Sequence, residues 1–241
     1  MTPDAAPVAA LAEAGSTNDE AMARLRASGT PLWLTAARQT AGRGRRGRPW
    51  SSEPGNLYAS YAFSPDWAPR VFALLPLACA VALGDALATF GIAPQLKWPN
   101  DVLVDGAKCA GILIEAETSM TARRAVIGFG VNVSHAPADV AATKVGAYAA
   151  DATADTVFAA LRPALGEIFA ALTAPDGIET IRARWLQRAV GIGLPVVVRY
   201  DSNSIEGRFL GLDEDGRLIL EQEGGTRTIS AGDVFVRTER L

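Results

Sequence analysis

Residues 95–115 of the chain read QLKWPNDVLVDGAKCAGILIE, and this stretch predicts the centre of a β-sheet. An apolar run at 102–104 is followed by Asp105-Gly106 and then by a second apolar run over 108–117. Asp-Gly between two such runs is a strong signal for a two-residue hairpin turn. A third run follows at 124–133. Consecutive strands joined by short turns favour an antiparallel or mixed sheet.

The residues before this hairpin predict further strands and helices. Apolar patterning predicts strands at 7–13, 32–37 and 56–63 and a helix at 68–90, where a proline at position 76 predicts a kink or a late start. Another helix starts near Thr17, which has the capping-box spacing to Glu20. The simplest role for Ser16, Thr17 and Asn18 is therefore helix capping.

The residues after the hairpin predict two helices and then a change of pattern. The helices are expected at 153–173 and 178–189, and Gly191-Ile-Gly193 marks a boundary. Short strands with tight turns follow at 196–200, 205–212, 217–221, 226–230 and 234–237, which suggests a small barrel. The sequence therefore predicts an α+β fold, with a mixed or antiparallel sheet and flanking helices over residues 1–190 and a small β domain over residues 191–241.

Composition limits the functional classes. The chain has 241 residues, 49% of them hydrophobic, and a net charge of −3. A nucleic-acid-binding protein would more often be basic. The longest apolar window, at 74–87, is broken by a proline, a glycine and an aspartate, so no membrane span is expected. No signal peptide is recognisable, and Cys79 and Cys109 have no disulfide-like spacing. We therefore expect a cytoplasmic enzyme or binding protein.

The scarcity of histidine argues against two kinds of catalytic site. His135 is the single histidine, which nearly excludes a multi-histidine metal site or a Ser-His-Asp triad built around residues 42–50. Cys79 lies on the apolar face of its predicted helix, and Cys109 faces away from Lys108 by strand alternation. Both thiols are expected to be core residues.

A glycine- and arginine-rich segment, GRGRRGRPW at residues 42–50, interrupts the regular pattern. Glycines at this density disfavour helix and strand, and neighbouring arginines repel one another unless an anion lies among them. We call residues 42–50 the arginine loop. From its own residues the loop is equally compatible with an anion-binding loop, a solvated surface loop and a nucleic-acid patch.

Two more polar clusters lie in the predicted sheet. Lys97, Asn100 and Lys108 come close together when the hairpin folds, and Gly128-Phe-Gly-Val-Asn132 places glycines inside a strand. Such glycines mark a close approach of backbone or ligand. Strand alternation does not decide whether Lys108 points into a cleft or to solvent.

Taken together, these clusters resemble the ordered motifs of biotin protein ligases. The motifs are the arginine loop, KWPND at 97–101, KCAGILIE at 108–115 and GFGVN at 128–132. The resemblance covers nearly the whole chain. It implies a class II synthetase-like catalytic domain and a C-terminal SH3-like barrel. Because the motifs begin at Ser16, it also implies the monofunctional type without an N-terminal DNA-binding domain.

The resemblance implies that biotin and ATP form biotinyl-5'-AMP, and that biotin then passes to a lysine of a biotin carboxyl carrier protein. It assigns biotin contacts to Ser16, Thr17, Asn18, Gln39, Arg43, Gly44, Arg45, Lys108 and Gly111. It assigns ATP contacts to Arg45, Trp50, Lys97, Asn100, Asp101, Lys108 and Asn132. Catalytic cations would be Lys108, Arg43, Arg45 and Arg48, since two anions must be brought together. Asp101 is a weak candidate for binding Mg²⁺.

Two alternatives remain open at this point. A lipoate-protein ligase or octanoyltransferase of related fold also transfers an acid to a carrier lysine, although the arginine loop and Gln39 favour biotin. A nucleic-acid-binding module would use the arginine loop, but the acidic net charge disfavours it. We expect neither nucleic-acid nor membrane binding, and the resemblance admits a homodimer.

Overall fold

The computed structural model describes residues 2–118, 123–200 and 203–237. Its first domain is built on a seven-stranded sheet in the order β1-β2-β3-β7-β6-β5-β4. The strands are β1 (Val8–Ala14), β2 (Leu32–Gln39), β3 (Leu57–Phe63), β4 (Gln95–Lys97), β5 (Asp101–Val104), β6 (Ala107–Thr118) and β7 (Arg123–Val131). Only β1 and β2 pair in parallel, and the other neighbours are antiparallel, which confirms the predicted mixed sheet.

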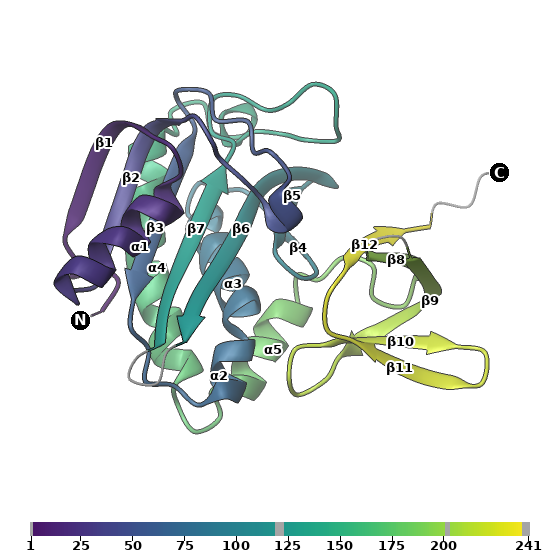
Figure 1. The fold of residues 1–241 in the computed structure, drawn as a ribbon. Coiled ribbons are helices and arrows are strands. Elements are labelled where there is room, and N and C mark those ends of the chain that lie inside the picture. Colours follow the sequence, from purple (N-terminus) through teal and green to yellow (C-terminus); the bar gives the residue numbers. More distant parts are fainter. Residues whose placement is uncertain (1, 119–122, 201–202, 238–241) are drawn as a thin grey trace.

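Helices cover both faces of this sheet (Figure 1). Helix α1 (Thr17–Ser28) packs on β2, β3 and β7 from one side. Helices α3 (Leu75–Ala88), α4 (Ala154–Leu172) and α5 (Gly177–Leu186) lie on the other side, and the short α2 (Pro69–Ala73) precedes α3. The predicted break near Pro76 is confirmed, because the helix divides at Leu74. Proline is readily tolerated in the first turn of a helix, where its missing N–H is not needed.

Aromatic side chains between the sheet and α4 form the centre of the core. The Trp33 ring lies 5.0 Å from Tyr61, 6.0 Å from Phe129 and 5.2 Å from Phe158, measured between ring centroids. All seven residues of β3 are buried, since this central strand is covered on both faces. The core therefore fixes β3 and its neighbour β7, and β7 carries Gly128, Phe129 and Gly130 of the candidate site.

The capping prediction for α1 was wrong. Ser16 occupies the N-cap position, but its side chain makes no capping hydrogen bond. Thr17 Oγ1 instead donates to Gln39 Oε1 at 3.0 Å, and Asn18 Nδ2 donates to Glu115 Oε2 at 2.7 Å. Partners far along the chain thus take these side chains away from the helix end.

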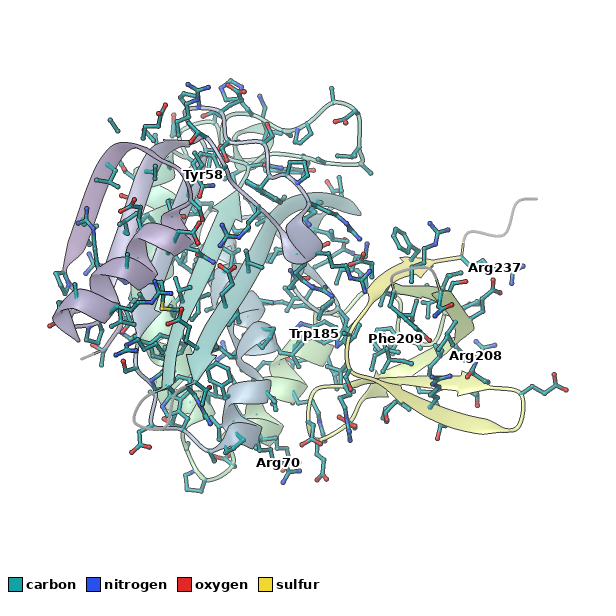
Figure 2. All side chains as sticks on the ribbon, in the orientation of Figure 1. Tyr58, Arg70, Trp185, Arg208, Phe209 and Arg237 are labelled. Atoms are coloured by element: carbon teal, nitrogen blue, oxygen red, sulfur yellow. The ribbon has the colours of Figure 1, made fainter. Side chains whose placement is uncertain are left out.

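The second domain is a five-stranded antiparallel sheet in the order β11-β10-β9-β8-β12. Its strands are β8 (Pro195–Tyr200), β9 (Asn203–Leu212), β10 (Leu218–Gln222), β11 (Gly225–Ile229) and β12 (Asp233–Val236). Figure 2 labels Phe209 in its interior and Trp185 on α5, the helix nearest to it. Within the described residues, no helix combines the length and the apolar character needed to cross a membrane.

Candidate active site

A cleft of about 580 Å³ lies between strands β4 to β7 of the first sheet, the arginine loop and β12. All of the site residues predicted above line it, although they come from four separate parts of the sequence. The structure therefore brings the predicted residues together, while the role of each one stays a prediction. The cleft also contains Asp233, Val234 and Phe235 of the second domain, which no sequence motif pointed to.

One end of the cleft is a network of neutral polar groups around Gln39. Its Oε1 accepts hydrogen bonds from the Thr17 backbone N–H at 2.9 Å and from Thr17 Oγ1, and its Nε2 donates to Ser52 Oγ at 3.1 Å. Ser60 Oγ lies 2.8 Å from Thr17 Oγ1 and 2.7 Å from Asn18 Oδ1. Such mutually oriented amide and hydroxyl groups suit a neutral polar ligand group rather than a charged one.

Gly128 makes room for this network. A Cβ atom at Gly128 would lie 2.4 Å from Asn18 Oδ1, well inside any normal contact. Asn18 is held by Ser60, by Glu115 and by the carbonyl of Leu113, so moving it aside would cost these hydrogen bonds. The strand needs glycine here for space and not for an unusual backbone conformation.

We expect Gly128→Ala to be destabilising by about 1–3 kcal/mol, the usual cost of forcing a methyl group into a packed interior. It should also weaken ligand binding at this end of the cleft, because Asn18 would be displaced. Thermal unfolding and titration with biotin measure the two effects. Gly15→Ala is the control, since nothing lies within 4 Å of a Cβ atom there. Equal behaviour of the two variants would contradict the packing argument.

Arg43 is paired with two carboxylates, Asp19 and Glu115, that do not line the cleft. Its guanidinium donates to both oxygens of Asp19, at 2.7 and 2.6 Å, and to Glu115 Oε1 at 2.9 Å. The hydrogen bonds that Arg43 donates to Asp19 and then to Glu115 raise the pKa of Arg43, and the hydrogen bond from Arg43 lowers the pKa of Asp19. In this state Arg43 anchors the arginine loop to α1 and β6, and two carboxylates compensate its charge before any ligand binds.

Arg45 extends further into the cleft. Its Nη1 donates to Asn100 Oδ1 at 3.0 Å, and its Nη2 donates to the carbonyl of Gly232 at 3.1 Å. Burial lowers the pKa of Arg45, and the charge of Asp233 opposes that effect. Arg45 hydrogen-bonds to neutral oxygens and lies 3.7 Å from the Asp233 carboxylate, which it shares with Arg46 and Arg48. Its charge is therefore less compensated than that of Arg43, and Arg45 is the loop cation best placed for an anion.

Lys108 points into the cleft, which answers the question that strand alternation left open. Its Nζ lies 2.6 Å from Asp101 Oδ1 and 5.4 Å from the centre of the Trp50 ring. On the same side, Lys97 Nζ lies 4.9 Å from the centre of the Phe235 ring, and burial lowers the pKa of Lys97. Lys97 of β4 and Lys108 of β6, on either side of β5, therefore both line the cleft.

Trp50 rests on two glycines of the sheet. A Cβ atom at Gly130 would lie 2.7 Å from Trp50 Cε2, and one at Gly111 would lie 3.1 Å from Trp50 Cζ3. The indole Nε1 is buried and has no hydrogen-bond partner among the described residues. The glycines thus allow an aromatic ring to lie flat on β6 and β7, as a stacking surface at the centre of the cleft.

Asn132 lies at the edge of the cleft and is almost fully buried. Its side-chain Nδ2 donates to the carbonyls of Lys108, at 3.4 Å, and Thr143, at 3.1 Å. Bidentate pairing with adenine would need this amide to exchange those partners. Its assignment to the adenine edge stays a prediction.

The carboxylates of the cleft do not form a resident metal site. Among the described residues, no three His, Cys, Asp or Glu side chains cluster in a way that could hold a metal ion. Asp101 is a single carboxylate, and its Oδ1 already contacts Lys108. Mg²⁺ commonly takes one or two carboxylates together with phosphate oxygens. Asp101 is therefore suited to bind a Mg²⁺ ion that enters the cleft together with the phosphate groups of a ligand.

The thiols lie outside this chemistry, as predicted. Cys79 and Cys109 are fully buried. Burial raises the pKa of Cys109 to about 12 and also raises the pKa of Cys79. A raised thiol pKa keeps the sulfur protonated near neutral pH, and the protonated thiol is a poor nucleophile.

We expect the folded protein to react very slowly with a thiol reagent such as DTNB at pH 8, and to release two equivalents after unfolding in guanidinium, because the chain has two cysteines. Absorbance at a fixed reagent concentration follows both reactions. Rapid reaction of one thiol in the folded state would show that a cysteine is accessible and would reopen a nucleophilic role.

Family models and known sequences match most of this chain. The model of the Biotin/lipoate A/B protein ligase family matches residues 14–132, and that of the Biotin protein ligase C terminal domain matches residues 191–237. The chain is 38% identical over 240 residues to the biotin--[acetyl-CoA-carboxylase] ligase of Paracoccus denitrificans, which covers 93% of this chain and 98% of the relative. It is 30% identical to the bifunctional ligase/repressor BirA of Escherichia coli K12, over 98% of this chain and 75% of the relative.

Solved structures give the same picture. The biotin protein ligase of Aquifex aeolicus in complex with biotin and ATP superposes with a TM-score of 0.81 at 28% identity, over 96% of this chain and 98% of that one. The biotin protein ligase of Leishmania major in complex with biotinyl-5-AMP gives a TM-score of 0.66 at 26% identity, over 93% and 99% of the two chains.

Proposed function

The chain belongs to the biotin protein ligase family, and from that premise we propose that it joins biotin to ATP as biotinyl-5'-AMP and then transfers biotin to a lysine of a biotin carboxyl carrier protein. The single observation that carries the proposal is the polarity of the cleft. A neutral hydrogen-bonding network around Gln39 lies at one end, and Arg45, Lys97 and Lys108 lie at the other. A ligand with a neutral ureido ring and an anionic tail fits this distribution.

In the first step, a biotin carboxylate oxygen attacks the α-phosphorus of ATP. The bond from phosphorus to the bridging oxygen breaks, and pyrophosphate leaves. Lys108 and Arg45 reduce the repulsion between the two anions and stabilise the charge that develops at phosphorus. We assign a smaller share of this role to Arg43 and Arg48, because their ion pairs, with Asp19 and Glu115 and with Asp233, compensate their charge and mainly hold the arginine loop. Mg²⁺ carried by the phosphates would lie near Asp101 and would neutralise further charge.

In the second step, the amine of the carrier lysine attacks the acyl carbon of biotinyl-5'-AMP. The bond between that carbon and the phosphate oxygen breaks, AMP leaves, and the amine proton passes to solvent. The enzyme needs no nucleophile of its own, in keeping with protonated, buried thiols. The arginine loop would exclude water from the mixed anhydride until the carrier arrives.

Other parts of the proposal concern organisation and partners. We propose residues 1–190 as the catalytic domain and 191–241 as the small second domain. The acceptor is expected to be a carboxylase carrier domain, as the printed name of the Paracoccus denitrificans relative suggests. A cytoplasmic location and a homodimer stay predictions.

Biotin-dependent exchange between ATP and labelled pyrophosphate tests the proposal. We expect exchange with biotin and little with lipoate, and stronger heat release with biotin in isothermal titration. Tighter lipoate binding would favour the lipoate ligase alternative instead. Absence of exchange with either acid would refute the adenylation mechanism.

A further inference from the structure

Asp233, the first residue of β12, contacts the arginine loop from the second domain. Its carboxylate accepts a hydrogen bond from Arg48, and its oxygens lie 3.7 Å from nitrogens of Arg45 and of Arg46. The preceding residue, Gly232, accepts a hydrogen bond from Arg45 at 3.1 Å. One short segment of the second domain thus holds three arginines that lie more than 180 positions earlier in the sequence.

The charges at this contact favour a closed loop. The Asp233 side chain is only 18% exposed and is the carboxylate shared by the three guanidinium groups. Burial by itself would raise the pKa of Asp233, but the hydrogen bond from Arg48 and the neighbouring arginine charges outweigh it and lower the pKa. The carboxylate is therefore ionised at neutral pH. Without it, the arginines would repel one another and the loop would lose its attachment to β12.

We infer that Asp233 is a positioning residue that holds the arginine loop closed across the two domains, and so retains biotinyl-5'-AMP until the carrier lysine arrives. The inference rests on the proposed function. Asp233 itself touches neither biotin nor phosphate in this scheme. It acts through Arg48, which ties the loop down, and through Arg45, whose position beside Asn100 depends on the closed loop.

Loss of the Asp233 contact should change the release rate of biotinyl-5'-AMP and leave the KM for ATP largely unchanged, whereas general unfolding would change both. Replacing Asp233 by asparagine removes a negative charge, so the cleft mouth becomes more positive and the approach of ATP is not weakened. What is lost is the closed position of the loop. Release of biotinyl-5'-AMP should therefore accelerate about tenfold, a modest effect because the Arg48 end of the ion pair is 61% exposed. The KM for ATP should stay within about twofold of the parent value, because the removed group is negative.

The experiment uses the full chain with Asp233→Asn, Asp233→Glu and the control Asp215→Asn. Asp215 also forms an ion pair between the domains, with Arg70 at 3.2 Å, and Figure 2 shows Arg70 far from the arginine loop. Each protein is loaded with labelled biotin and ATP in the presence of pyrophosphatase. After gel filtration, excess unlabelled biotin is added and release of labelled biotinyl-5'-AMP is followed. Steady-state pyrophosphate exchange gives the KM for ATP.

We expect fast release from Asp233→Asn, recovery toward the parent rate in Asp233→Glu, which keeps the carboxylate, and parent behaviour in Asp215→Asn. Added NaCl should accelerate release from the parent and have little effect on Asp233→Asn, because salt screens the same ion pair. Arg48→Gln removes the other partner of that pair. It should show the same raised release rate even if Asp233→Asn folds poorly.

Parent-like release from Asp233→Asn or from Arg48→Gln would overturn the inference, as would equally fast release from Asp215→Asn. A change confined to the KM for ATP would overturn it as well. Failure of the parent to form biotinyl-5'-AMP would instead refute the proposed function, so the two failures are distinguishable.

Discussion

Lys108→Ala is expected to lower biotin-dependent pyrophosphate exchange by roughly 10²–10³-fold, the loss typical of removing one pre-organised donor from a site of developing charge. The Lys108 ammonium lies 2.6 Å from Asp101 and beside the Trp50 ring, so its position is fixed before any anion binds. The loss should appear mainly in kcat, because the charge that Lys108 neutralises develops during bond formation.

The matched control is Lys144→Ala. Lys144 Nζ donates to the carbonyl of Ser134 at 2.9 Å on an exposed segment, and the residue is not part of the cleft lining. We expect parent-like exchange from this variant. Exchange in Lys108→Ala within about threefold of that control would be too small a loss for a pre-organised donor and would remove Lys108 from the mechanism.

Arg45→Ala is expected to reduce exchange by about 10²-fold, at the lower end of the range for such donors because the side chain is partly exposed. Of the loop arginines, Arg45 is the one that donates to Asn100 within the cleft. The neighbouring cation Arg43 is neutralised by Asp19 and Glu115, so Arg43→Ala should act mainly by loosening the loop and should cost less.

Arg38→Ala serves as the control for removing an arginine. Its side chain is 58% exposed and pairs with Glu13 at 3.4 Å, an arrangement that contributes little to stability. Rates measured at saturating biotin and ATP separate a chemical loss from weaker binding. The assignment of Arg45 fails if its alanine variant matches Arg38→Ala, or if Arg43→Ala proves more damaging.

Local sequence signals accounted for most of the fold. Asp105 and Gly106 have φ angles of 50° and 77°, as the hairpin signal requires, and Pro76 lies in the first turn of α3. The capping prediction failed because Gln39 and Glu115, distant in sequence, compete for Thr17 and Asn18. Local spacing carries no information about such partners.

The sequence predicted which residues line the cleft, but not how their side chains are arranged there. Motif resemblance selected residues that all line the cleft, yet it grouped Arg43 with Arg45, whose surroundings differ. The direction of Lys108 depends on an irregularity in the pairing of β5 with β6 near Leu103, which strand alternation does not reveal. Asp233 was missed because its significance comes only from the contact between domains.

The arginine loop is tied to both domains, through Arg43 to α1 and β6 and through Arg48 to β12. The domains are also joined by the chain near Ala189, where β4 pairs with residues 188–190. The Arg70–Asp215 ion pair, at 3.2 Å, is a further contact between the domains. Several contacts between two domains leave few independent movements, so we expect a rotation of the small domain about the connection near Ala189 to pull on the arginine loop through Arg48. A partner protein that binds the small domain would therefore also change how readily the arginine loop opens.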